Sequence, residues 1–295
     1  MTLINRAGPR SVALETTLLA HGVPADSAPA LAANLAADVR AAGAVPAVVG
    51  VVRGRAIVGM TDGELAAMLA DAADPARGVM KANSANLGVA LHRGFSAATT
   101  VSTTMELAAS AGVRLFATGG LGGMHRLGSG PLDISADLGA FARFPVAVVA
   151  SGVKAILDVE STREMLETLG VPVVGFRTDR FPAFYLRDSG AKVDARFDDI
   201  ADLAAFLGAE LQRTGRGVLV ANPVPEADEL PRADWDKWLA LAEAEAGASG
   251  AGRDATPRVL SALHRLSAGA TLRANIALVR SNARLAGALA AALSV

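Results

Sequence analysis

Short apolar runs rich in Val, Ala and Leu alternate along this chain with stretches of helical spacing, and this alternation restricts its fold most. Strands are predicted at residues 11–14, 45–52, 55–58, 79–81, 114–118, 145–150, 171–175 and 217–220, and helices at 27–42, 61–70, 83–92, 100–111, 161–169 and 198–212. Such a repeat places helices on both faces of a sheet. The sequence therefore predicts a three-layer α/β/α fold with a mostly parallel central sheet, and a ligand at the carboxyl ends of its strands.

Local signals define how some of these elements begin and end. Arg53-Gly54 separates two apolar runs and predicts a hairpin. Ser27 is expected to cap one helix, and Thr61 with Glu64 forms a capping-box pattern at the start of the next. Residues 244–255, rich in Ala, Gly and Ser, predict a flexible loop that two helices follow. We expect a single domain over residues 1–295, with C-terminal helices.

Composition narrows the class of ligand. The 28 Lys and Arg residues nearly balance the 29 Asp and Glu residues, which gives no electrostatic case for nucleic acid or an anionic membrane. Arginines interrupt the apolar stretch 271–293, so it is not expected to span a membrane. No cysteine is present and the first residues contain no apolar leader run, both of which favour the cytoplasm. A small-molecule substrate is the expectation.

The glycine-rich segment 118–123 follows a predicted strand but lacks the G-x-G-x-x-G spacing and the P-loop signature. Met124, His125 and Arg126 come directly after it. Free backbone N–H groups beside two potential cations can surround a phosphate. The alternative is a tight turn with a solvated His125 and Arg126.

The segment 133–138 reads as a helix start. Ser135 is the expected N-cap and Asp137 lies in the first turn, where the helix dipole favours an acid. Capping leaves Asp133 unexplained. A lone carboxylate outside the helix can hold a hard divalent cation that keeps most of its waters.

Two further residues carry possible chemistry. Lys154 is surrounded by small and apolar residues, and desolvation frees an amine to act as a nucleophile. Its alternative is a surface lysine that extends its ammonium group to water. Glu15 follows an apolar strand and precedes two threonines, so it is either a general acid or an ordinary edge residue.

Together these segments resemble the ordered motifs of the pseudouridine-5′-phosphate glycosidases, also named pseudouridylate synthases. The resemblance runs from about residue 12 to the last helix. The motifs are LETTLLAHG (14–22), TTV (99–101), TGGLGGMHR (118–126), DISADL (133–138), GVKAILDVEST (152–162), LGVPVVGF (169–176), FPAFYLRDSG (181–190), ANPVPE (221–226) and ANIALVRSNARLA (274–286).

The resemblance implies reversible cleavage of pseudouridine 5′-phosphate to uracil and ribose 5-phosphate. It assigns the imine-forming amine to Lys154, the proton donor to Glu15 and a water-coordinated Mn²⁺ to Asp133. It also implies an α/β/α fold and a homotrimer. The substrate-binding positions that it implies are Lys81, Val101, Thr118, His125, Ser135, Ala136, Asp137 and Asn275.

The chain departs from this pattern at two places. Ala82-Asn83-Ser84-Ala85-Asn86 follows Lys81 where the family usually has a basic pair and an acid, and LGSGPL (127–132) replaces the usual continuation after the His-Arg pair. Two other functions therefore stay open. One is a Schiff-base, aldolase-like enzyme that acts on another sugar phosphate. The other is a non-catalytic relative that only binds a nucleotide.

Overall fold

The computed structural model describes residues 3–74, 76–125, 133–248 and 255–293. Its strands are β1 (Leu3–Asn5), β2 (Ser11–Leu14), β3 (Val45–Val52), β4 (Arg55–Val58), β5 (Met80–Ala82), β6 (Ala97–Thr99), β7 (Leu115–Ala117), β8 (Ala147–Ala150), β9 (Val173–Phe176), β10 (Ala195–Phe197) and β11 (Val218–Ala221). Its α-helices are α1 (Ala28–Ala41), α2 (Asp62–Ala73), α3 (Leu87–Arg93), α4 (Val101–Ser110), α5 (Ala136–Phe141), α6 (Val159–Thr168), α7 (Ile200–Thr214), α8 (Arg232–Ala248), α9 (Ala255–Leu266) and α10 (Ala270–Ala292). A π-helical turn (Leu18–Gly22) and a 3₁₀ turn (Glu226–Asp228) complete them.

One sheet joins the described strands in the order β1-β4-β3-β2-β7-β8-β11-β9-β10, with β6 and then β5 attached beside β3. From β3 to β10 every neighbouring pair is parallel. The second half of β3 turns away from β2 and pairs antiparallel with β4 and β6. The predicted mostly parallel sheet is confirmed.

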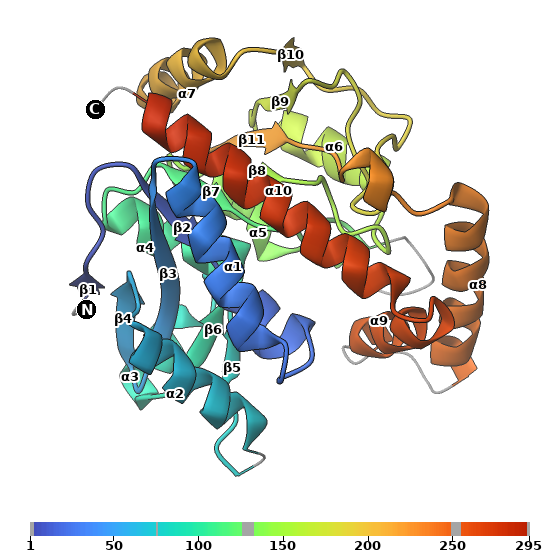
Figure 1. The fold of residues 1–295 in the computed structure, drawn as a ribbon, viewed down its shortest axis with the longest axis horizontal. Helices are drawn as coiled ribbons and strands as arrows, with labels where there is room; N and C mark the ends of the chain where they lie inside the picture. Colours follow the sequence, from blue (N-terminus) through green and yellow to red (C-terminus); the bar gives the residue numbers. More distant parts are fainter. Residues whose placement is uncertain (1–2, 75, 126–132, 249–254, 294–295) are drawn as a thin grey trace.

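Side chains alternate between two cores, one on each face of the sheet. Val12 and Leu14 of β2 lie in the core beneath α1, α7 and α10, whereas Ala13 lies in the core beneath α4, α5 and α6. Successive residues of a strand point to opposite faces, so a sheet covered on both sides needs apolar residues at every position. Figure 1 shows α10 running diagonally across one face with α1 beside it. The three-layer prediction is confirmed.

The hairpin between β3 and β4 forms at the predicted dipeptide. Arg53 and Gly54 both have positive φ, 48° and 73°, as a two-residue hairpin turn with the twist of its strands requires. A side chain at Gly54 would lie 2.7 Å from the carbonyl oxygen of Leu91. Glycine is needed here both for its conformation and for the close approach of α3.

Helix ends agree with the sequence in one case and differ in two. Thr61 and Glu64 form the predicted capping box on α2. Ser27 precedes α1 but its side chain makes no capping hydrogen bond, because its backbone is already helical (φ −88°, ψ −22°) rather than extended as in a capping residue. Its hydroxyl donates to the side chain of Asp26. The flexible loop predicted at 244–255 is wrong where it is described, since α8 continues to Ala248 and α9 begins at Ala255. Alanine is the best helix former, and it outweighs the glycine in this stretch.

Among the described residues, no helix is both long and apolar enough to cross a membrane.

Candidate active site

The sheet changes its direction of growth between β2 and β7. From β2 the chain adds β3 on one side, and it later adds β7 and β8 on the other. At such a point a crevice opens outside the carboxyl ends of parallel strands. Glu15 directly follows β2 and Thr118 directly follows β7. The topology therefore brings together two residues that lie 103 positions apart.

Glu15 is the carboxylic acid of this site. The hydroxyl of Thr118 donates a hydrogen bond to its Oε1. Burial raises the pKa of the Glu15 carboxyl, and the positive charge of Lys154 and the Thr118 hydroxyl offset only part of this rise. An acid that keeps its proton to higher pH than usual is suited to donate it to a substrate.

Lys154 lies on the segment that continues β8 beyond its carboxyl end. The N–H of Lys154 donates to the carbonyl of Leu121 at 3.1 Å, and the N–H of Leu121 donates to Gly152 at 3.0 Å. Gly152 has φ 76°, and a side chain there would fall on the carbonyl oxygen of Pro182, so only glycine fits. Lys154 is half-buried, and its charge acts on both Glu15 and Lys81. The amine and the acid therefore share one site.

The start of α5 contributes a second carboxylate. Ser135 caps the helix as predicted, because its Oγ accepts the N–H of Asp137 at 3.2 Å. The helix dipole alone does not account for Asp137, which is a correction to the sequence analysis. Its carboxylate is buried and accepts the N–H groups of Ser102 and Gly122, both at 2.9 Å. Asp137 thus joins α4 and the glycine segment to α5, whose first residue is Ala136.

Lys81 and Val101 come from β5 and from the start of α4. Lys81 lies in β5, and desolvation of its ammonium group together with the charge of Lys154 lowers its pKa, against the opposite effects of Asp137 and Glu15. Val101 is the first residue of α4 and is buried in the core, directly before Ser102. Four ionisable side chains, Lys81, Lys154, Glu15 and Asp137, therefore influence one another here.

Part of the glycine segment packs against protein. Its N–H groups at Leu121, Gly122 and Met124 all donate to protein acceptors. A side chain at Gly120 would lie 2.5 Å from the ring of Phe184, and one at Gly123 would fall on Thr162. The prediction of free N–H groups around a phosphate is therefore wrong for these three positions. Arg126 lies outside the described residues.

His125 and Asp133 lie together at the rim. The N–H of His125 donates to the carbonyl of Asp133 at 3.0 Å, and its Nε2 lies 3.7 Å from the Asp133 carboxylate, whose side chain is 71% exposed. Within the described ranges, no three His, Asp or Glu side chains gather in a way that could hold a metal ion. These residues fit an ion bound mainly by water and one carboxylate, and they do not fit a cage made of protein ligands.

Asn275 approaches the site from α10. Its Oδ1 is buried without a hydrogen-bond partner among the described residues. A side chain at Gly119 would lie 3.2 Å from this oxygen and 3.4 Å from the ring of Phe184. An unpaired amide oxygen is costly to bury, which is a reason to expect a donor from a ligand or water here.

Several polar residues at the strand ends were missed by the sequence analysis. The hydroxyls of Thr16 and Thr99 both donate to the carbonyl of Val49, at 2.9 and 2.8 Å, and so fix the chain that leaves Glu15. Ser151 follows β8, and Asn222 follows β11. A polar residue directly after an apolar strand is the signal that could have found them.

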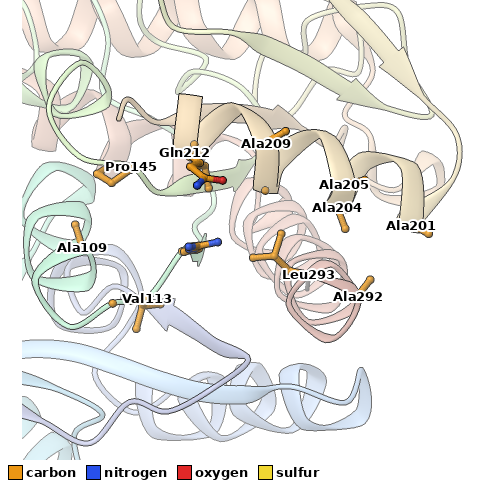
Figure 2. A pocket seen from close by; sticks show the side chains of 14 residues that line it. Ala109, Val113, Pro145, Ala201, Ala204, Ala205, Ala209, Gln212, Ala292 and Leu293 are labelled. Atoms are coloured by element: carbon orange, nitrogen blue, oxygen red, sulfur yellow. The ribbon is translucent and has the colours of Figure 1, made fainter. Parts of the chain in front are cut away.

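One large cavity of the described residues lies away from this site, whereas a smaller one, of about 340 Å³, is lined by Ala155, which follows Lys154. A cavity of about 860 Å³ opens at the opposite, amino edge of the sheet, where Arg114 precedes β7 and Pro145 precedes β8. Figure 2 shows it between α7 and the end of α10, which contributes Ala292 and Leu293. None of the predicted site residues lines it.

Comparison with known proteins first gives the class. Residues 4–292 match the family described as indigoidine synthase A like protein. A crystal structure of an indigoidine synthase A-like protein from Thermotoga maritima superposes with a TM-score of 0.88 at 35% identity, covering 98% of this chain and 96% of that one. The prealnumycin C-glycosynthase AlnA in complex with ribulose 5-phosphate superposes with a TM-score of 0.86 at 38% identity, covering 97% of this chain and 91% of that one. The chain is a member of this enzyme class.

Curated relatives then give the particular family. The pseudouridine-5′-phosphate glycosidase of Methylobacterium nodulans is 50% identical over 97% of this chain and 84% of its own length. That of a Jannaschia species is 46% identical over 98% of this chain and 94% of its own length. The chain belongs to the pseudouridine-5′-phosphate glycosidase family, and the predicted resemblance is confirmed.

Proposed function

We propose that this enzyme reversibly cleaves the carbon–carbon glycosidic bond of pseudouridine 5′-phosphate, giving uracil and ribose 5-phosphate, through an imine on Lys154. The observation that carries the proposal is the placement of a carboxylic acid, Glu15, directly after β2 and hydrogen-bonded to Thr118, at the edge of the sheet where the half-buried Lys154 follows β8. Burial raises the pKa of this acid. The activity named for the relatives supports the substrate, and the ribulose 5-phosphate bound to AlnA supports a sugar phosphate.

The substrate's chemistry requires such a pair. In pseudouridine the ribose C1′ is bonded to C5 of uracil, so there is no leaving-group heteroatom for the two-carboxylate scheme of ordinary glycosidases to protonate. In a covalent route, an amine instead bonds to C1′ and forms an imine with it as the base leaves. The site needs an uncharged lysine and an acid at the ring oxygen.

The steps balance with these two residues and water. The Lys154 amine bonds to C1′, the bond from C1′ to the ring oxygen breaks, and that oxygen takes the proton of Glu15. The bond between C1′ and C5 then breaks as C5 gains the proton that the attached Lys154 nitrogen loses, which leaves uracil and an imine on Lys154. Water adds to the imine carbon, and ribose 5-phosphate leaves as the free amine returns.

The neighbouring residues support these steps through charge and hydrogen bonding. The Thr118 hydroxyl orients the Glu15 carboxyl. The negative charge of Asp137 raises the pKa of Glu15, which favours the protonated acid that the first step consumes. Lys81 brings positive charge to the same crevice and suits an anionic phosphate or a carbonyl oxygen of the base.

We further propose that Asp133 helps to hold one Mn²⁺ that is coordinated mainly by water. Its exposed carboxylate suits such an ion. When bound, the ion would supply positive charge that orients the substrate. Chelation should lower uracil release and added Mn²⁺ should restore it, and Asp133→Asn should weaken Mn²⁺ binding measured directly by electron paramagnetic resonance. Full activity of the metal-free enzyme would remove the ion from the proposal.

The assembly and location that the resemblance implies are also proposals. We propose a cytoplasmic homotrimer. The absence of cysteine is consistent with a reducing compartment. Sedimentation equilibrium of the purified protein tests the trimer, because a mass of one or two chains would contradict it.

A second candidate function has a specific observation in its favour. AlnA is named as a C-glycosynthase and binds ribulose 5-phosphate. The same lysine and acid could serve a Schiff-base enzyme that joins or splits another sugar phosphate.

Release of uracil from pseudouridine 5′-phosphate, followed by its ultraviolet absorbance after chromatography, tests the main proposal. We expect catalytic turnover, and the reverse reaction from uracil and ribose 5-phosphate. If neither reaction occurs while ribose 5-phosphate still forms a trapped imine, the second candidate is favoured. If nothing is trapped and nothing turns over, the chain only binds its ligand.

A further inference from the structure

A buried asparagine on α10 links the carboxyl ends of three strands. Asn282 has no solvent exposure. Its Nδ2 donates to the carbonyl of Thr118 at 2.8 Å and to the hydroxyl of Ser151 at 3.1 Å, while its Oδ1 accepts the Nδ2 of Asn222 at 2.8 Å. The hydroxyl of Ser151 in turn donates to the carbonyl of Asn222 at 2.8 Å. One amide thus joins the residues that follow β7, β8 and β11.

This placement differs from what helix packing requires. The neighbouring positions of α10 that face the sheet are apolar, for example Leu278, Val279 and Ala286, and such residues pack without polar partners. A buried amide is costly unless it is hydrogen-bonded, and its partners become costly if it is removed. The apolar residues are sufficient to pack α10 against the sheet, so packing does not explain why Asn282 makes these hydrogen bonds.

The partners of Asn282 lead to both proposed reacting groups. Thr118, whose carbonyl Asn282 holds, donates through its hydroxyl to Glu15. Ser151, whose hydroxyl Asn282 holds, precedes by three residues the lysine on the same continued segment. The Thr118–Asn282 and Ser151–Asn282 bonds therefore fix the separation between the segment that orients the acid and the segment that carries the amine.

We propose that Asn282 is a positioning residue, which sets the geometry of Glu15 and Lys154 from α10 through Thr118 and Ser151. This inference rests on the proposed function. In this proposal Asn282 does not touch the reacting atoms. It acts as a cross-brace between strand ends, and a small displacement of those ends is enough to misalign reacting groups.

Loss of the brace should have a recognisable signature. The charged groups that act on Glu15 are Lys154, Asp137 and Lys81, and the Thr118 hydroxyl is the hydrogen bond that lowers its pKa. If Thr118 is released, that hydrogen bond weakens and the pKa of Glu15 rises further. Activity that requires protonated Glu15 then persists to higher pH, although the maximal rate falls.

The test compares wild type with Asn282→Leu, which keeps the size of the side chain and removes its polar atoms. We expect kcat to fall by roughly tenfold to a hundredfold, with a smaller change in KM and with the alkaline limb of the pH profile moved to higher pH. The titration of Glu15 is also read without turnover, from the carboxyl infrared band that Glu15→Gln abolishes. Arg284→Ala is the control, because Arg284 binds Asp38 of α1 at 3.2 Å and reaches no strand end.

The outcomes separate the two proposals. If wild type releases no uracil, the proposed function fails, and the infrared titration still tests the brace. An unchanged kcat and Glu15 titration in a folded Asn282→Leu protein would overturn the inference, as would equal effects from Arg284→Ala. If Asn282→Leu does not fold, Asn282→Ser, which leaves room for a bridging water, and Asn222→Ala, which removes the partner of Oδ1, carry the same measurements. In a Thr118→Val background, the effect of Asn282→Leu on the alkaline limb should vanish, and an additive effect would contradict action through Thr118.

Discussion

The two edges of the central sheet are built from different residues. At the carboxyl edge, a polar residue directly follows β2, β7, β8 and β11: Glu15, Thr118, Ser151 and Asn222. At the amino edge, a cavity of about 860 Å³ is lined mostly by alanine and glycine from α4, α7 and α10 (Figure 2). A smaller cavity, of about 340 Å³, lies beside residues 155–160, beyond the carboxyl end of β8. Cavities therefore open at both edges, whereas the titratable groups of the predicted site gather at the carboxyl edge.

The difference teaches that the polar residues of this fold gather where parallel strands end, and that the size of a cavity does not locate them. In a parallel sheet the connecting helices begin near the carboxyl ends of the strands, so backbone N–H groups are available there for carboxylates and ligands. Asp137 uses two of these N–H groups, from Ser102 and Gly122.

The largest expected effect comes from removing the amine at the carboxyl edge. Lys154→Ala should lower turnover at least a hundredfold. A hundredfold loss of rate corresponds to a barrier higher by about 2.7 kcal/mol, and loss of covalent catalysis should raise the barrier by more than this. Folding should be intact by circular dichroism. The matched control is Lys192→Ala, since Lys192 is exposed and its charge does not contribute to the pKa shifts of Glu15 or Lys81. Retention of more than about one hundredth of the wild-type rate would be incompatible with an imine.

The acid should show a large but selective effect. Glu15→Gln keeps the shape of the side chain but cannot donate a carboxylic proton, so turnover of pseudouridine 5′-phosphate should fall by about a hundredfold or more. Borohydride trapping should fail with this closed-ring substrate and persist in part with ribose 5-phosphate, which already populates some open-chain aldehyde. Equal trapping of both compounds at wild-type levels would leave Glu15 a structural acid.

The same substitution should stabilise the protein at neutral pH. Because burial raises the pKa of Glu15, the native state holds this proton at pH values where the unfolded chain has lost it, and stability falls as pH rises from the unfolded pKa to the folded pKa. Glutamine does not ionise, so the Glu15→Gln protein does not lose stability in this way as pH rises. Urea midpoints of the two proteins should converge below the ordinary pKa of glutamate and diverge above it. If the difference between the two urea midpoints does not vary with pH, burial of the ionised Glu15 carboxylate does not destabilise the protein.

The smallest effect is expected at the amino edge. Ala209→Leu adds a good helix former to an exposed position of α7 that lines the cavity. We expect kcat within twofold of wild type and a change in the free energy of unfolding within about 0.5 kcal/mol. A tenfold loss of activity, with stability unchanged, would assign function to this edge and break the comparison.

Local patterns in the sequence were sufficient for much of the fold. The hairpin at Arg53-Gly54 and the capping box at Thr61 are determined by residues close in sequence, and both are found. The strands with continuous apolar runs were also located. The strands β1, β6 and β10, three residues each, were missed because their pairing depends on neighbours distant in sequence.

The site was predictable in its residues more than in its connections. Glu15 and Lys154 were identified by their settings, but their association depends on the order of strands in the sheet. Asp137 was explained by local capping, yet its carboxylate binds residues 15 and 35 positions away. Asn282 gave no signal beyond a polar residue within an alanine-rich helix, because its partners come from three separate strand ends.

Borohydride trapping of the wild-type enzyme with ribose 5-phosphate, followed by peptide mass mapping, tests the central claim most directly. The chain contains four lysines, and two of them, Lys81 and Lys154, lie at the crevice. The proposed mechanism predicts a single reduced ribose 5-phosphate adduct on the peptide that contains Lys154, and none on Lys81, Lys192 or Lys237. An adduct on Lys81 alone, or no adduct in an enzyme that releases uracil, would contradict it.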